Sequence, residues 1–298
     1  MPKRKSNRKL TIPLAIVLCI AAAISYLVQN GGNDTKAPVS SYPGDCTMEV
    51  HFIDVGQGMA TLIRHQGGDI LIDTGDRDAK DELFAYLEQE KVTEFTYVIG
   101  SHPHADHVAN LDDVLLTYDV ETLFLTDSPY DSKIWDDIHS AISDTGVNQE
   151  SPKAGYTCSV EDVVLEFMAP LQDTKEYSDA NDWSYVVKVT HGGDTFLFPG
   201  DATVYSENEM LAWYTHGELD VDVFEVSHHG SYLSNSPQFL RELTADQYVI
   251  SCGKDNQYDH PSKETLSRIE EMDGGEIYRT DEDGSIVMKS SGNGITVE

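Results

Sequence analysis

Apolar positions from residue 48 onward follow two patterns. Some fall in short β-type runs separated by glycine-containing turns, which predict strands. Others recur with helical spacing, as Leu83, Phe84 and Leu87 do. The predicted strands are 48–54, 60–64, 69–73, 95–100, 120–125, 163–168, 184–190, 195–198, 221–226, 248–251, 276–278 and 285–288. The predicted helices are 80–91, 133–143, 206–214, 237–243 and 262–272. This mixture favours an α/β sandwich with mixed sheets over a purely parallel doubly wound sheet.

The amino-terminal part of the chain has a different character. Residues 10–28 carry no charge, and their number is close to the roughly 20 that a membrane-spanning helix needs. The basic residues of segment 1–9 place that segment in the cytoplasm and the bulk of the chain outside. An uncleaved membrane anchor is the interpretation we favour. A signal peptide cut near Ala23 or Ser25 is the alternative, and the protein would then be secreted.

Residues 29–45 are rich in Gly, Pro, Ser and Asp, so we expect a flexible linker there and one globular domain over 46–298. The formal net charge is −32. Such a charge repels polyanions, or adapts the protein to high salt, and composition does not choose between these. Three cysteines of the exported part, Cys46, Cys158 and Cys252, allow at most one internal disulfide.

Candidate chemistry begins directly after strand 95–100. His102, His104, Asp106 and His107 place four metal-binding side chains within six residues. Imidazole and carboxylate groups suit zinc or a related divalent ion. His102 and His104 can converge on one ion, while Asp106 and His107 turn toward a second.

Three further polar clusters follow apolar strands in the same way. Asp73 ends strand 69–73, Asp201 follows strand 195–198, and His228-His229 follows strand 221–226. No Gly-x-Ser-x-Gly motif and no P-loop is present to support a different catalytic scheme.

Taken in order, seven segments resemble the metallo-β-lactamase superfamily, and within it the hydrolase domain of the ComEC/Rec2 competence proteins. They are His51-Phe-Ile-Asp-Val-Gly-Gln-Gly58, Leu71-Ile-Asp-Thr-Gly75, Ser101-His-Pro-His-Ala-Asp-His107, Asn181-Asp-Trp-Ser184, Pro199-Gly-Asp201, His228-His-Gly-Ser231 and Asp259-His-Pro-Ser262. The resemblance implies an αββα sandwich and a site for two metal ions, zinc or alternatively manganese. The resemblance covers the hydrolase domain of these proteins and does not extend to their multi-helix membrane channel.

Roles for single residues follow from this resemblance. His102 and His104 would bind the first ion, and Asp106 and His107 the second. Asp201 would bridge the two ions.

A histidine of the His228-His229 pair would complete the second set, and we favour His229 because it directly precedes the glycine of the motif. Asp73 would orient the cluster from behind the ligands. Both follow from the resemblance and not from spacing alone.

One departure from the superfamily concerns the first ion. Most relatives supply a further histidine where this chain has Asn181-Asp182. We predict that Asp182 replaces it, with Asn181 or a water as the alternative. Asp182 precedes a strand whose hairpin partner leads to Asp201, so both should lie at one sheet edge. His139 and His191 are interpreted as surface residues.

His260 has two interpretations. It either caps the helix that begins near residue 262 or lies over the metals and donates a proton to an anionic oxygen. Lys254 could act similarly, and Gln57 with Gly58 could line the cleft.

These residues together predict a hydrolase in which a water shared by two ions attacks an ester. The expected substrate is a small anionic ester or a nucleic acid, with a phosphodiester favoured. A lactam or lactone hydrolase and a non-catalytic binding module are the alternatives. Apart from the membrane, no partner can be deduced.

Overall fold

The computed structural model describes residues 47–171, 177–272 and 275–298. These residues belong to one compact unit, Tyr42–Glu298. The segments 1–9, 10–28 and 29–45 lie outside the described residues, so their predicted roles stay predictions. Within the described part of the chain, no helix combines the length and apolar character that a membrane crossing needs.

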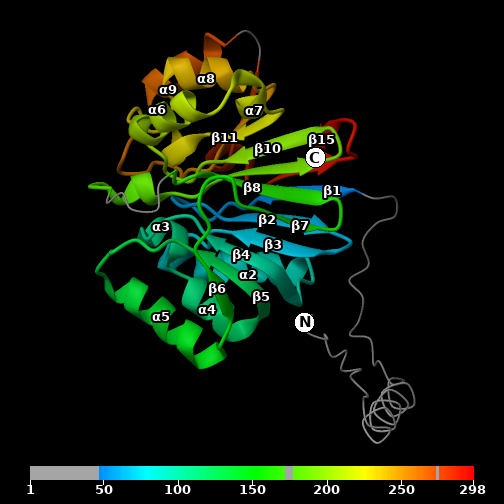
Figure 1. Cartoon of the computed structure of the whole chain (residues 1–298), viewed down its shortest axis with the longest axis vertical. Helices are drawn as coiled ribbons and strands as arrows, with labels where there is room; N and C mark the ends of the chain where they lie inside the picture. Colours follow the sequence, from blue (N-terminus) through cyan, green and yellow to red (C-terminus); the bar gives the residue numbers. More distant parts are fainter. Residues whose placement is uncertain (1–46, 172–176, 273–274) are drawn as a thin grey trace, which may run out of the picture. The chain divides into compact units, whose positions relative to one another are not determined.

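Two mixed β-sheets form the centre of this unit (Figure 1). The eight-stranded sheet has the order β15 (Ile295–Val297), β14 (Ile286–Ser290), β1 (Met48–Phe52), β2 (Thr61–His65), β3 (Gly68–Ile72), β4 (Glu94–Gly100), β5 (Asp119–Leu125), β6 (Asn148–Glu150). The seven-stranded sheet has the order β13 (Glu276–Arg279), β12 (Gln247–Ile250), β11 (Val223–Glu225), β10 (Asp194–Phe198), β9 (Val186–His191), β8 (Val163–Ala169), β7 (Thr157–Val160). Neighbouring strands are parallel from β3 through β4 and β5 to β6, and from β10 through β11 and β12 to β13. The remaining pairs are antiparallel.

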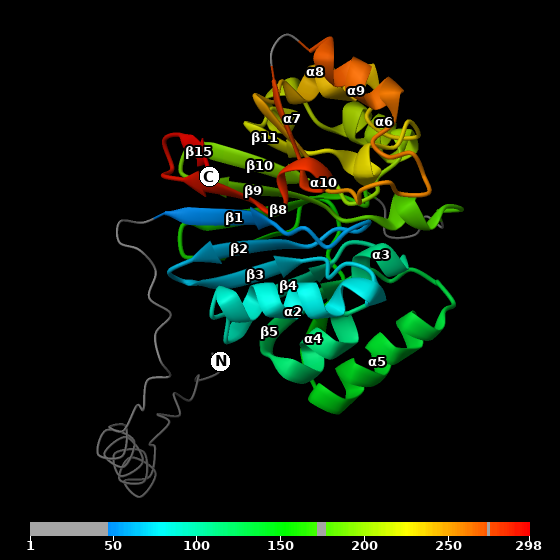
Figure 2. The ribbon, with the colours of Figure 1, turned by 180° about the vertical axis from the view of Figure 1, so that it is seen from behind.

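Helices cover the outer face of each sheet (Figure 1, Figure 2). Those on the eight-stranded sheet are α2 (Lys80–Gln89), α4 (Leu111–Thr117) and α5 (Lys133–Thr145). Those on the seven-stranded sheet are α6 (Val204–Trp213), α8 (Pro237–Leu243) and α9 (Lys263–Glu270). Shorter helices are α3 (Ala105–Val108), α7 (His216–Leu219), α10 (Thr280–Asp283) and the 3-10 turns η1 (Arg77–Ala79), η2 (Ala180–Trp183) and η3 (Ser227–Gly230). The predicted αββα sandwich is confirmed.

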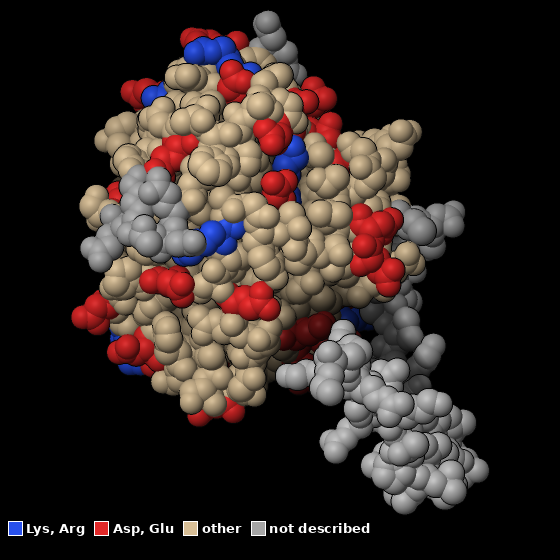
Figure 3. All heavy atoms as spheres, viewed as in Figure 1, with Lys and Arg blue, Asp and Glu red and all other residues tan. Residues whose placement is uncertain are grey.

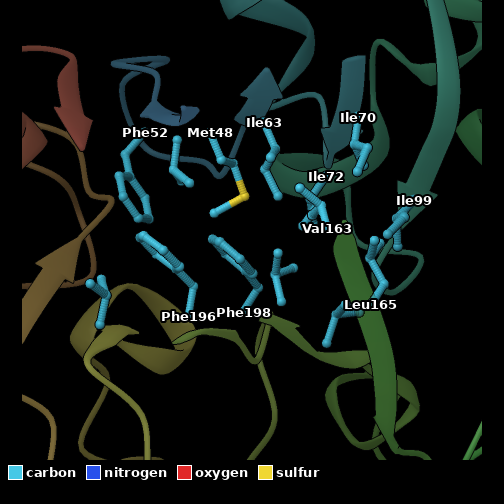
Figure 4. Packing of buried hydrophobic residues seen from close by; sticks show 14 of the residues in the cluster. Met48, Phe52, Ile63, Ile70, Ile72, Ile99, Val163, Leu165, Phe196 and Phe198 are labelled. Carbon is cyan, nitrogen blue, oxygen red and sulfur yellow. The ribbon is translucent and has the colours of Figure 1, made fainter. Parts of the chain in front are cut away.

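The core between the sheets is built from strand residues that point inward (Figure 4). Phe52 of β1 faces Phe198 of β10 with ring centroids 6.0 Å apart. Met48 and Phe196 are also fully buried there. Because helices cover the outer faces, central strands are apolar on both sides, which explains why strand 60–64 lacks a polar alternation.

Some elements were not predicted from the sequence. Strands β6 and β7 are short and largely polar. Helix α4 follows the histidine segment, and its N-cap residue Asn110 makes no side-chain capping hydrogen bond. Strand β14, near the C-terminus, pairs with β1, and His51 lies opposite Val287. This long-range pairing completes the eight-stranded sheet and has no local sequence signal.

Candidate metal centre

Polar loops from both sheets meet at one edge of the sandwich, where α3 is labelled in Figure 1. Strands β3 and β4 are parallel neighbours, as are β10 and β11, so their carboxyl ends lie together. The residues that follow these ends are Asp73, His102, Asp201 and His228. The structure therefore gathers the four predicted clusters into one site.

Asp73 lies behind the histidines and holds two of the site's elements in place. Its Oδ2 accepts a hydrogen bond from Nδ1 of His107 over 2.7 Å. Its carboxylate also accepts hydrogen bonds from the backbone N–H and the hydroxyl of Ser101, both at 2.7 Å. Asp73 has a φ of 59°, a strained conformation that non-glycine residues adopt mainly where surrounding contacts enforce it. This is the orienting position predicted for it.

Six of the predicted ligands form two groups. The first group is His102, His104 and Asp201, and the second group is Asp106, His107 and His229. The ligand atoms of each group lie within 4.8 Å of one another. Both groups combine imidazole with carboxylate, the donor set that zinc and related ions bind.

Asp201 lies between the groups and presents one oxygen to each. Its Oδ1 is 3.1 Å from Nε2 of His107 and 3.8 Å from Nε2 of His229. Its Oδ2 is 3.7 Å from Nε2 of His102 and 3.4 Å from Nε2 of His228. A carboxylate in this position can bridge two cations.

Three buried atoms test whether the site fits a cation. Nε2 of His107, Nε2 of His229 and Oδ1 of Asp201 have no hydrogen-bond partner among the described residues. Unpartnered buried polar atoms are costly unless something else satisfies them. Nδ1 of His229 is used by the backbone carbonyl of Ser251 at 2.9 Å, which leaves Nε2 with the lone pair that a metal requires. The residues fit a bound metal ion.

The charges in the site are strongly coupled. Burial alone would raise the pKa of Asp201, but the nearby His107 and His229 outweigh it and hold this pKa well below its usual range. Burial would likewise lower the pKa of His107, but the carboxylates of Asp201 and Asp73 raise it well above its usual value. The carboxylates of Asp201 and Asp73 thus stabilise positive charge in the site, whether a proton or a metal ion carries it.

The His228-His229 pair occupies η3 in an unusual backbone conformation. Both residues have positive φ, 55° and 52°, and Gly230 follows at 82°. A Cβ at Gly230 would lie 2.6 Å from Cβ of Pro261. The sharp turn points His229 into the second group, whereas His228 lies outside both groups and faces Oδ2 of Asp201.

The prediction for Asp182 is not supported by the geometry. Asp182 lies at the expected edge, but its Oδ1 accepts hydrogen bonds from the hydroxyls of Thr203 and Ser206, at 2.6 and 3.1 Å. It belongs to neither ligand group. Thr203 is the N-cap of α6, so the carboxylate stabilises the start of that helix. Asn181 instead lines a pocket beside the two ligand groups, and its buried Oδ1 lacks a hydrogen-bond partner among the described residues.

The two remaining histidines differ from each other. His139 is exposed on α5, as predicted, and Nδ1 contacts the carbonyl oxygen of Trp135 at 2.8 Å. His191 was expected at the surface, and this is wrong. It is only 2% exposed, because turns from both sheets cover the β9–β10 hairpin.

His260 lies over the site. It lines a pocket of about 350 Å³ together with His104, Asp106, Asp201 and Gln57. The cap of α9 is Ser262, whose hydroxyl accepts from the N–H of Thr265, so the capping interpretation of His260 is wrong. Burial and the neighbouring histidines lower the pKa of His260 to about 4. Lys254 lines a separate, adjoining pocket.

Two residues of the site were missed from the sequence. Ser101 links Asp73 to the histidine segment, and Glu225 lies buried behind the site, accepting a hydrogen bond from Ser251 at 2.8 Å. A charged residue within the apolar run 221–226 was the available signal for Glu225.

Comparison with known proteins agrees with this geometry. Residues 53–124 match the sequence profile of the Metallo-beta-lactamase superfamily. Over these residues the chain is similar to the metallo-β-lactamase superfamily. The chain is 26% identical to ComE operon protein 3 of Bacillus subtilis, in a match that covers 93% of the chain. It is 30% identical to Recombination protein 2 of Haemophilus influenzae, in a match that covers 75% of the chain. Both are ComEC/Rec2-type competence proteins, so the resemblance is confirmed. The chain spans 38% and 26% of these relatives.

A solved structure with the same fold is the metallo-beta-lactamase fold protein YhfI of Bacillus subtilis. It has a TM-score of 0.55 and 13% sequence identity, covering 83% of this chain and 100% of YhfI. The likeness supports the metallo-β-lactamase fold of this chain. That fold implies binding of divalent metal ions.

Proposed function

We propose that this protein is a two-metal hydrolase of phosphodiesters, anchored in the cell membrane by residues 10–28 with its domain outside. The observation that carries the proposal is the position of Asp201 between the two ligand groups. Its carboxylate offers one oxygen to each group. Two divalent ions held there would lower the pKa of a water and stabilise the charge that develops on an attacked ester.

The residues around the ions have separate tasks. His102 and His104 would hold one ion, while Asp106, His107 and His229 would hold the other. Asp73 keeps His107 in one orientation by the hydrogen bond to Nδ1.

The pocket supports an anionic substrate. Nε2 of Gln57 and Nδ1 of His260 are buried without hydrogen-bond partners among the described residues, and both residues line the pocket. His260 is neutral at pH 7 because its pKa is about 4, so one ring nitrogen carries a proton that it can donate to an oxygen. Gln57 is held by a hydrogen bond from the backbone N–H of Gly253 to its Oε1, over 3.0 Å.

A small phosphodiester suits this protein better than a long nucleic acid. Acidic side chains recur over the face in Figure 3, with basic ones interspersed, and the net charge is −32. Such a surface repels an extended polyanion, whereas a small ester feels mainly the local field of the ions. The competence relatives extend the proposal to nucleic-acid phosphodiesters, which the experiment below compares directly.

The test compares hydrolysis of bis-p-nitrophenyl phosphate, single-stranded DNA and nitrocefin by one metal-loaded preparation. We expect turnover of the phosphodiester and its loss in His104→Ala, with His139→Ala as a matched control on the exposed face of α5. Turnover of nitrocefin alone would assign a lactamase. Metal binding without turnover of any ester would assign a binding module.

Topology is tested separately. Protease added to intact spheroplasts should degrade the domain if residues 10–28 anchor it outside. Full protection would place the domain in the cytoplasm, whereas recovery of the domain in the culture medium would indicate a cleaved signal peptide.

A further inference from the structure

We propose that His65, Asp162 and His191 bind a third divalent ion of the zinc type, at the edge of the sandwich opposite the candidate active site. Their ligand atoms lie within 4.8 Å of one another. Two imidazoles and a carboxylate are a donor set that such ions accept. The proposal is independent of the hydrolase function.

Three separate segments build this site. His65 ends β2 in the eight-stranded sheet, and His191 ends β9 in the seven-stranded sheet. Asp162 lies in the turn between β7 and β8. Because β2 and β9 belong to different sheets, an ion held by all three residues would clamp the two sheets together at this edge.

The distances suit a small cation between the three side chains. Nε2 of His65 is 3.1 Å from Oδ1 of Asp162, and Nε2 of His191 is 3.8 Å from Oδ2. The two imidazole rings are 5.8 Å apart between centroids. Donor atoms that each form a bond of about 2 Å to one zinc ion are separated from one another by distances similar to these 3.1 and 3.8 Å.

The hydrogen bonds around His191 determine which of its nitrogens carries the proton. The hydroxyl of Ser290 donates to Oδ2 of Asp194 over 2.6 Å. Its oxygen therefore accepts from Nδ1 of His191, which is 2.7 Å away. A neutral His191 then has a lone pair on Nε2, directed toward a carboxylate oxygen. Two electron-rich atoms face each other stably only with a cation or proton between them.

This arrangement is the one that metal-binding histidines commonly have. The ring nitrogen remote from the metal donates a hydrogen bond that fixes the tautomer and the ring orientation. Here that link runs from His191 through Ser290 to Asp194, and Oδ1 of Asp194 accepts a further hydrogen bond from the N–H of Gly294 at 2.7 Å. The support for the ligand is therefore built from buried groups.

His65 supplies the second observation that points to a ligand. The residue is fully buried, and Nε2 has no hydrogen-bond partner among the described residues, because Asp162 is close but outside hydrogen-bonding geometry. Burial lowers the pKa of His65, which favours the neutral form that binds metal ions. Asp162 is exposed over 60% of its side chain, so the site is open to solvent for entry of an ion and for a water ligand.

The rival explanation is a proton in place of the metal. The N–H of Gly67 lies 3.3 Å from Nδ1 of His65. This N–H donates a hydrogen bond to Nδ1, so without a bound ion a neutral His65 carries its proton on Nε2 and forms an ordinary ion-dipole contact with Asp162. The two explanations differ in metal content, which is measurable.

The experiment counts metal ions in the full chain after zinc loading and removal of loosely bound zinc. Asp162→Asn removes the exposed ligand without altering the core, and Glu161→Gln is the matched control in the same exposed turn. We expect one ion fewer per chain in Asp162→Asn than in Glu161→Gln or the unaltered protein. This difference holds whether or not the candidate active site binds metal or turns over an ester.

A second measurement protects the test against an altered fold. Zinc should raise the midpoint of thermal unfolding more for Glu161→Gln than for Asp162→Asn, because the ion binds the folded state. Equal metal counts in the three proteins would overturn the proposal. So would an Asp162→Asn variant that is destabilised equally with and without zinc, which is the result for a proton link.

Discussion

Oδ2 of Asp73 accepts a hydrogen bond from Nδ1 of His107, and this contact fixes which ring nitrogen of His107 faces Asp201. Because Nδ1 donates to Asp73, Nε2 is the nitrogen whose lone pair would bind a metal ion in the second group. Asp73, which belongs to neither ligand group, thereby sets the tautomer of a histidine that would bind an ion.

Asp73→Asn should therefore weaken metal binding by about 10- to 100-fold, the usual effect of removing such a support. Competition with a metal-sensitive dye would measure the affinity. Asp78→Asn, at an exposed position of η1, serves as the control. Unchanged affinity in Asp73→Asn would show that the hydrogen bond does not orient the ligand.

Asn181 and Asp182 should differ sharply despite being neighbours. Asn181→Ala removes a buried, unpartnered oxygen from the pocket and should lower kcat/KM for the phosphodiester about tenfold, equivalent to one polar contact of about 1.4 kcal/mol. Asp182→Asn should leave kcat/KM unchanged. It should lower the free energy of unfolding by about 1 kcal/mol, because it weakens the contacts to Thr203 and Ser206. The reverse pattern would restore Asp182 as a ligand.

Glu225 should make stability depend on pH. Burial raises its pKa from 4.5 to about 7, so between these values the folded state holds a proton that the unfolded state has released. Stability from this group is complete below pH 4.5 and is lost as pH rises to 7, by about 3 kcal/mol. Glu225→Gln lacks this loss. Urea unfolding of both proteins in chelator at pH 5 and pH 8 should show the variant gaining relative stability at pH 8, and a constant difference would contradict it.

Cys158 and Cys252 are free thiols, and burial raises their pKa values to about 11 and about 12. At pH 8 their thiolate fractions are only about 10⁻³ and 10⁻⁴, so both should resist alkylation until the protein unfolds. Mass spectrometry of iodoacetamide-treated native and denatured protein would measure this. Rapid labelling of Cys252 in the native protein would show that the structure around this buried thiol opens locally.

Much of the fold was predictable because its strands are short apolar runs with clear ends. Strand 95–100 and helix 237–243 agree closely with β4 and α8. Strands β6 and β7 were not predicted, because polar edge strands are stabilised by pairing with distant partners and not by their own composition.

The same distinction between local sequence features and distant contacts applies to the candidate site. The segment from His102 to His107 and the strand-end positions of Asp73 and Asp201 are local features, and they were sufficient to predict a metal centre. The choice of His229 rested on the glycine that follows it. The turn conformation of η3 agrees with this choice.

The sequence alone thus determined which side chains could carry the chemistry, since apolar runs and His/Asp motifs are encoded by neighbouring residues. Only the tertiary structure decided where three of them point. Asp182 turns to the hydroxyls at the start of α6, Asn181 takes its place in the pocket, and His191 is buried beside His65. Side-chain direction depends on partners from distant strands, and no local pattern records which partner will be present.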